Sequence, residues 1–120
     1  MEKRKKILVC DDELGVREAY SLILSKDYAL DFATTADEAV EKVKIHKYAG
    51  VIMDIKMPKK NGLEALTDIK TISPELKVLI VTGYQSIDTA MRAIKLGAVD
   101  YMTKPFESIE LLRKIQDITE

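Results

Sequence analysis

Five short apolar runs alternate with five helical segments, and this alternation constrains the fold more than any other feature of the chain. Three runs, residues 7–10, 51–53 and 78–81, are continuous and rich in β-branched residues, as expected for strands buried on both faces. Two weaker candidates are residues 29–33 and 99–102. Strict alternation indicates parallel strands covered by helices on both faces. The predicted fold class is therefore a doubly wound α/β sheet of five strands.

Hydrophobic residues between these runs recur with helical spacing. Residues 36–43 and 87–94 place apolar side chains at i, i+3, i+4 and i+7, the stripe of an amphipathic helix. Residues 16–23 and 111–118 carry similar stripes. Four methionines fall on apolar positions, and we expect a packing role for all of them: Met53, Met57, Met91 and Met102.

Local signals mark where the helices begin and end. Thr35 followed by Glu38, and Asn61 followed by Glu64, resemble capping boxes, in which the first side chain accepts a backbone N–H and the second reaches back. Gly97 follows the fourth helical segment, where a C-terminal glycine is expected.

The length and composition of the chain limit the class of protein to which it can belong. A length of 120 residues is typical of one domain, which we expect to span residues 1–120. A net charge of −1 gives no electrostatic footprint for direct nucleic-acid binding. The sequence contains neither an apolar run long enough for a membrane span nor the core of a signal peptide, and its single Cys cannot form an internal disulfide. We therefore expect a cytoplasmic domain.

Polar residues gather where the expected strands end. They are Asp11, Asp12 and Glu13 after the first strand, Asp54 after the third, Thr82 and Gly83 after the fourth, and Thr103 and Lys104 after the fifth. In an open α/β sheet, ligands bind beyond the carboxyl ends of the strands. Taken singly, an aspartate can cap a helix or start a turn, and a lysine can be a solvated surface residue. Their occurrence at four strand ends favours a common site.

Three of these residues are carboxylates that meet if the first and third strands are neighbours. Asp11, Asp12 and Asp54 would then repel one another unless a cation lies among them, and oxygen ligands suit Mg²⁺. A nearby lysine and a threonine hydroxyl are groups that a phosphoryl group requires. Asp54 is the candidate nucleophile, which would form an aspartyl phosphate.

The same residues form a set of motifs that is specific as a whole. The motifs are Asp11-Asp12, residues 53–58 with Asn61-Gly62, Thr82-Gly83, and residues 97–106. In this order and spacing they resemble the receiver domain of two-component response regulators, and the resemblance covers essentially the whole chain. It implies a flavodoxin-like (CheY-like) sheet in the strand order 2-1-3-4-5 with five helices.

The resemblance also implies a role for each site residue. The phosphoacceptor is Asp54, and the residues that act on the phosphoryl group are Asp54, Thr82 and Lys104. The Mg²⁺ ligands are Asp11, Asp12, Asp54 and the backbone carbonyl of Lys56. Phosphoryl oxygens would also meet the backbone N–H groups of Lys56 and Gly83. The switch residues are Thr82 and Tyr101, and the Lys104–Pro105 peptide bond is expected to be cis.

The function implied is a phosphorylation-dependent switch that assists only its own phosphorylation and dephosphorylation. A sensor histidine kinase would donate the phosphoryl group. The surface formed by the fourth helix, fifth strand and fifth helix would then control an output domain or partner, and activation can also produce a homodimer. The residues around Thr82 and Tyr101 most resemble receivers joined to AAA+ transcriptional activators of the sigma-54-dependent type. AAA+ and DNA-binding domains beyond the C-terminus are therefore expected partners. Other DNA-binding outputs, or a receiver that stands alone, are the alternatives.

Three other functions are alternatives to the switch. A flavodoxin-like module that binds a small ligand would need a loop rich in Ser, Thr and Gly after the first strand, whereas Asp11, Asp12 and Glu13 would repel a phosphate. A phosphatase of the haloacid-dehalogenase type would continue its Asp-x-Asp pattern into Thr, and Asp12-Glu13-Leu14 does not match that pattern. The third alternative is a receiver that is never phosphorylated.

Overall fold

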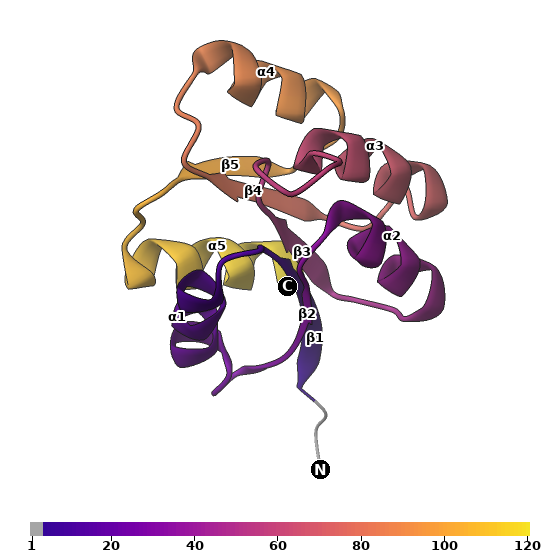
Figure 1. Ribbon diagram of the computed structural model, residues 1–120. Helices are drawn as coiled ribbons and strands as arrows, with labels where there is room; N and C mark the ends of the chain where they lie inside the picture. Colours follow the sequence, from indigo (N-terminus) through magenta and orange to yellow (C-terminus); the bar gives the residue numbers. More distant parts are fainter. Residues whose placement is uncertain (1–3) are drawn as a thin grey trace.

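The fold is a five-stranded parallel sheet in the order β2-β1-β3-β4-β5 (Figure 1). The computed structural model describes residues 4–120, so residues 1–3 of the predicted domain lie outside the described part. The strands are β1 (Lys5–Cys10), β2 (Tyr28–Ala33), β3 (Gly50–Met53), β4 (Val78–Thr82) and β5 (Asp100–Thr103). The helices are α1 (Leu14–Leu24), α2 (Ala36–Ile45), α3 (Gly62–Ile72), α4 (Ile87–Lys95) and α5 (Ser108–Thr119). The predicted fold class and strand order are confirmed.

Helices cover both faces of the sheet (Figure 1). Consecutive side chains of a strand point to opposite faces, so Ile7 and Val9 of β1 join the core beneath α1 and α5. Leu8 and Cys10 join the second core, beneath α2, α3 and α4. Burial on both faces explains why β1, β3 and β4 read as continuous apolar runs.

The N-cap hydrogen bonds predicted for α2 and α3 are present, but neither Glu38 nor Glu64 completes its capping box. The Thr35 hydroxyl accepts the backbone N–H of Glu38 (3.1 Å), and the Asn61 side chain accepts that of Glu64 (3.0 Å). In a capping box the Glu38 carboxylate would return to the N–H of Thr35, but here it accepts the N–H of Thr34 (2.7 Å). It therefore extends the cap by one residue.

The apolar stripe of α4 does not enter the core. Ile87, Met91 and Ile94 expose 76%, 57% and 49% of their surfaces, and Ala93 is the buried residue of the helix. The expected packing role is therefore wrong for Met91, although the methionines at 53, 57 and 102 are buried. The physical reason is position: α4 lies beside β5, the edge strand of the sheet, so part of its stripe has no neighbouring element to cover it.

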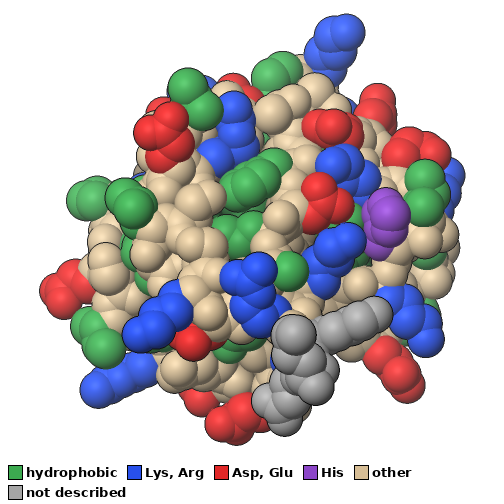
Figure 2. All heavy atoms as spheres, turned by 90° about the horizontal axis from the view of Figure 1, so that it is seen from below, with side chains coloured by type: hydrophobic (Ala, Val, Ile, Leu, Met, Phe, Trp, Pro, Cys, Tyr) green, Lys and Arg blue, Asp and Glu red, His purple; other side chains and the backbone are tan. Residues whose placement is uncertain are grey.

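The surface is mixed in charge. Figure 2 shows acidic and basic side chains interspersed over one face of the molecule, in keeping with the small net charge. Across residues 4–120, no helix has the length and apolar character that a membrane crossing requires.

Candidate functional site

The pairing of β1 with β3 brings two aspartates together at the carboxyl end of the sheet. Cys10 pairs with Met53 in the parallel register, so the residues that follow them, Asp11 and Asp54, emerge side by side. The backbone N–H of Asp54 donates to the carbonyl oxygen of Cys10 (3.0 Å). Both aspartates are buried, which makes a simple solvent-exposed turn the wrong interpretation for Asp54.

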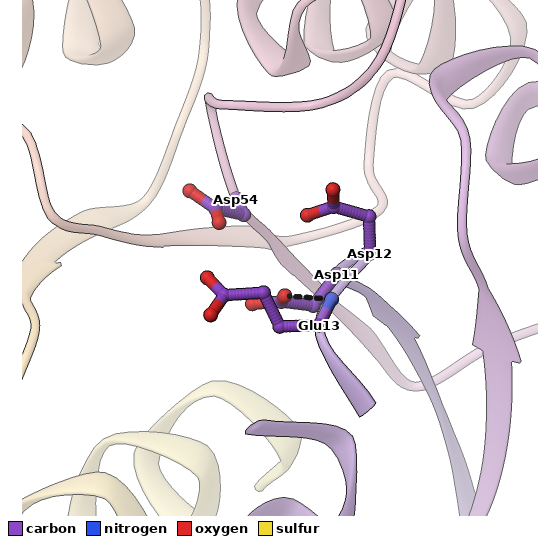
Figure 3. Close-up of side chains that lie close together, drawn as sticks. All are labelled: Asp11, Asp12, Glu13 and Asp54. Atoms are coloured by element: carbon purple, nitrogen blue, oxygen red, sulfur yellow. Dashed lines mark hydrogen bonds between the residues drawn. The ribbon is translucent and has the colours of Figure 1, made fainter. Parts of the chain in front are cut away.

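Four carboxylates, rather than the three expected, form the acidic cluster (Figure 3). Each of Asp11, Asp12, Glu13 and Asp54 offers an oxygen, and these oxygens lie within 4.8 Å of one another. Glu13 was not predicted as a site residue, and its only signal in the sequence is its position beside the aspartate pair. Glu13 is the N-cap residue of α1, but its side chain makes no capping hydrogen bond. That carboxylate is therefore free to face the site.

Lys104 reaches the same cluster from the end of β5. Its Nζ lies 2.6 Å from Oδ2 of Asp11, 2.9 Å from Oδ2 of Asp54 and 3.9 Å from Oε1 of Glu13. The backbone N–H of Lys104 donates to the carbonyl oxygen of Thr82 (2.8 Å), which fixes the start of the side chain, and the peptide bond to Pro105 is cis. Lys104 is therefore an ion-paired residue of the site, not a solvated surface lysine.

One ammonium group does not offset the charge of the cluster. Burial raises the pKa of the Asp11 carboxyl group, and the Lys104 ammonium and the N–H of Glu13 oppose this shift only in part. Burial would lower the pKa of Lys104, but the carboxylates of Asp11 and Asp54 outweigh it and raise that pKa. A second cation would favour the ionised form of Asp11.

The donor set fits a hard divalent cation. Its oxygens are carboxylates on one rim of the sheet, two of them buried and two exposed. Mg²⁺ takes one or two carboxylates and keeps several water ligands, and the exposed side of the cluster gives water access. Asp11, Asp12 and Asp54 are thus suited to hold Mg²⁺.

A cavity of about 300 Å³ opens beside Asp54. It is lined by Glu13, Asp54, Lys56, Thr82, Gly83, Tyr84 and Lys104. All five residues expected to contact a phosphoryl group therefore line this one cavity. The backbone N–H of Lys56 donates to Oδ1 of Asp54 (3.2 Å), so the Asp54 side chain is held toward this loop.

Thr82 and Tyr101 lie on neighbouring strands, where Thr82 is opposite Thr103 and Tyr101 is opposite Ile80. Thr82 is buried at the end of β4, and its hydroxyl lies 3.5 Å from the backbone N–H of Tyr84, which donates to it. The Tyr101 ring is half-buried against the core, and its pKa is raised by burial and by the negative charge of Asp54. Its hydroxyl donates to the carbonyl oxygen of Tyr84 (2.5 Å).

Comparison with known proteins gives the family of this chain. The family model "Response regulator receiver domain" matches residues 7–116. The transcriptional regulatory protein ZraR of Klebsiella oxytoca is 39% identical over 108 residues, covering 88% of this chain and 24% of the relative. This chain thus spans about a quarter of that relative's length.

Two solved structures show the same fold. A CheY-like response regulator receiver domain from Methanospirillum hungatei has a TM-score of 0.91 at 31% identity, covering 96% of this chain and 93% of that chain. The beryllofluoride-activated NtrC4 receiver domain dimer has a TM-score of 0.90 at 36% identity, covering 95% of each chain.

Proposed function

Because the chain belongs to the response regulator receiver family, we propose that it is a phosphorylation switch whose acceptor is Asp54. The observation that supports this most directly is the ion pair between Asp54 and Lys104 (2.9 Å) at the wall of an open cavity. A buried carboxylate that faces such a cavity, with a lysine and a threonine beside it, is arranged to form and hold an acyl phosphate.

The transfer step moves one phosphoryl group from a histidine kinase to Asp54. A carboxylate oxygen of Asp54 attacks phosphorus, the P–N bond to the kinase histidine breaks, and the imidazole leaves with its electron pair. The phosphoryl oxygens accept hydrogen bonds from the Lys104 ammonium, the Thr82 hydroxyl and the backbone N–H groups of Lys56 and Gly83. Later attack by water on phosphorus returns the Asp54 carboxylate and inorganic phosphate, so the domain acts on itself.

Mg²⁺ would be held by Asp11, Asp12, Asp54 and the backbone carbonyl of Lys56. When bound, it supplies positive charge that offsets the repulsion between the carboxylates and the incoming phosphoryl oxygens. Lys104 supplies a second, fixed positive charge at Oδ2 of Asp54 (2.9 Å).

The signal leaves the site through Thr82 and Tyr101. Phosphorylation adds about −1.5 to −2 charges beside the Thr82 hydroxyl, which is drawn inward to donate to it. Tyr101 responds because both side chains contact the backbone of Tyr84. The surface of α4, β5 and α5 changes as a result.

The output of this switch is control of transcription through a domain joined to the receiver. ZraR is a transcriptional regulatory protein, and the sequence around Thr82 resembles receivers of sigma-54-dependent AAA+ activators. The exposed apolar side chains of α4 also suit self-association on activation. We assign the switch to the cytoplasm, where a histidine kinase would reach it.

Labelling with acetyl phosphate and Mg²⁺ tests the proposal. Mass spectrometry is expected to show a species heavier by about 80 Da, the mass of a phosphoryl group, which is lost in an Asp54→Asn variant. Asp68→Asn, a half-exposed aspartate of α3, is the control and retains the label. A wild-type protein that never gains this mass would show a receiver that works without phosphorylation.

A further inference from the structure

The first residue of α3 lies directly against the backbone of the phosphoacceptor. The N–H of Gly62 donates to the carbonyl oxygen of Ile55 (2.8 Å). A Cβ atom added to Gly62 would lie 2.0 Å from the carbonyl oxygen of Asp54, and 2.8 Å from both its carbonyl carbon and the Cα of Ile55. All three distances are below 3.0 Å, and real Cβ atoms essentially never lie that close to another heavy atom. The atoms are backbone atoms, so no side-chain rotation can relieve the overlap.

Space, rather than backbone freedom, explains the glycine at this position. Gly62 is a helical residue, and among the described glycines only Gly97 has a positive φ, of 109°. Gly97 therefore needs a conformation that other residues rarely adopt. Gly62 needs only the absence of a side chain.

The contact fixes the segment that carries the acceptor. One end of this segment is held by the hydrogen bond from the N–H of Asp54 to Cys10 of β1 (3.0 Å), and the other by the hydrogen bond from Gly62 to Ile55. Between them, the N–H of Lys56 holds Oδ1 of Asp54 (3.2 Å).

We propose that Gly62 is a positioning residue for Asp54: its missing side chain lets α3 approach closely enough to set the distance from the acceptor to Asp11 and Lys104. The proposal rests on the proposed function of Asp54. Any Cβ at this position moves the acceptor backbone or the helix start. A displacement of about 1 Å is enough to slow a positioned reaction by about 100-fold.

Gly62→Ala is the test, and Gly15→Ala is its matched control. Gly15 lies in the first turn of α1, where an added Cβ would meet nothing within 4 Å. Three quantities are measured for each: thermal stability, Mg²⁺ affinity by NMR titration, and the rate of labelling by acetyl phosphate. Gly15→Ala is expected to match the wild type in affinity and rate.

Gly62→Ala is expected to weaken Mg²⁺ binding and to slow labelling by about 100-fold at temperatures where circular dichroism shows it folded. Shifted amide signals of residues 54–56 would accompany this loss. Wild-type affinity and rate in folded Gly62→Ala would overturn the proposal, as would losses that only follow the unfolded fraction. If the variant unfolds in buffer, all proteins are compared in trimethylamine N-oxide, which favours the folded state.

A third variant separates position from helix stability. Asn61→Ala removes the cap of α3 but adds no atom against Asp54, so it should lower stability and leave Mg²⁺ affinity unchanged. An equal loss of affinity in Asn61→Ala would overturn the proposal in favour of a general effect of helix fraying. If the wild type itself is not labelled, the proposed function fails instead, while the Mg²⁺ titration still tests the position of Asp54.

Discussion

The hydroxyl group of Tyr101 donates a hydrogen bond of 2.5 Å to the carbonyl oxygen of Tyr84. The N–H of the same residue, Tyr84, donates to the hydroxyl of Thr82. One backbone unit therefore contacts both side chains of the proposed switch. A movement of Thr82 toward a phosphoryl group would change the hydrogen bond of the Tyr84 N–H. Tyr101 would respond because it is hydrogen-bonded to the carbonyl oxygen of Tyr84.

Thr82→Ala should separate phosphorylation from signalling. The Asp54 and Lys104 ion pair remains, so labelling of Asp54 by acetyl phosphate should persist. Without the hydroxyl, the contact with the N–H of Tyr84 is lost, and NMR signals of Tyr101 should respond weakly to beryllofluoride with Mg²⁺. Thr103→Ala, at the exposed end of the neighbouring strand, is the control. A full response of Tyr101 in Thr82→Ala would show that Thr82 is not the switch.

The exposed stripe of α4 should be the surface that activation changes. Beryllofluoride with Mg²⁺ is expected to shift NMR signals of α4, β5 and α5 more than those of α2, and to promote self-association in sedimentation experiments. Met91→Asp places a charge in the stripe and should reduce that association. Ile45→Asp changes a residue of α2 that is still more exposed (72%, against 57% for Met91) and should not. Shifts confined to the acidic cluster would contradict this route for the signal.

Asp12→Asn should weaken Mg²⁺ binding without destabilising the fold. Removing one of four neighbouring carboxylates lowers cation affinity by about tenfold, while the relief of repulsion leaves or raises the melting temperature. Isothermal titration and thermal unfolding measure the two effects. Asp117→Asn, an exposed aspartate of α5, is the control. Unchanged affinity in Asp12→Asn would mean that this carboxylate does not take part in cation binding.

Lys104→Ala should destabilise the metal-free domain. It leaves two buried carboxylates without their cation, which costs about 3 kcal/mol, measurable by urea unfolding. The pKa of Lys104 is raised above its ordinary 10.5, so its contribution is complete below pH 10.5 and is lost as the pH rises through the raised pKa. The variant should lack that alkaline loss of stability.

A control variant and the addition of Mg²⁺ test this interpretation of Lys104. The control, Lys114→Ala, breaks a more exposed pair with Asp100 and should cost less than about 1 kcal/mol. Mg²⁺ should restore part of the stability of Lys104→Ala, because it neutralises the same carboxylates. An equal cost for both variants would show that burial of the Lys104 pair has no energetic consequence.

Tyr48→Phe should destabilise the fold in a pH-dependent way. The Tyr48 hydroxyl donates to Asp31 (2.6 Å), which also pairs with Lys42 (3.0 Å). Burial tends to raise the pKa of Asp31, but these hydrogen bonds outweigh it and lower that pKa. The bond to the carboxylate is worth about 1.5–3 kcal/mol. This stability is present above the unfolded pKa and is lost as the pH falls through the folded pKa.

Urea unfolding of Tyr48→Phe and the wild type at neutral and acidic pH checks this expectation. The difference between them should shrink once Asp31 is protonated. Tyr84→Phe is the control, because its hydroxyl belongs to an exposed ring, and it should be neutral at both pH values. A pH-independent difference for Tyr48→Phe would point to packing rather than to the Asp31 carboxylate.

Much of the fold could be predicted because it depends on local patterns. The apolar run of β1 and the cap at Thr35 each follow from residues within one turn or one strand. The polar residues at the strand ends were predicted as a group because parallel strands place their carboxyl ends on one rim. Carboxylate chemistry also indicated a cation among the aspartates and Asp54 as the nucleophile. The roles of Lys56, Gly83 and Tyr101, however, came from resemblance to a family and not from spacing.

The sequence by itself determined the order of strands and helices along the chain and the polar residues at the carboxyl ends of the strands. Hydrophobic periodicity and turn chemistry, which indicate these features, act over a few neighbouring residues. Only the tertiary structure decided which groups are in contact: Lys104 meets Asp11 across 93 positions, and Gly62 lies against the backbone of Asp54. It also left the stripe around Met91 exposed, since burial depends on the element that lies opposite. Such contacts arise from packing between elements far apart in the chain, and no local pattern encodes their distances.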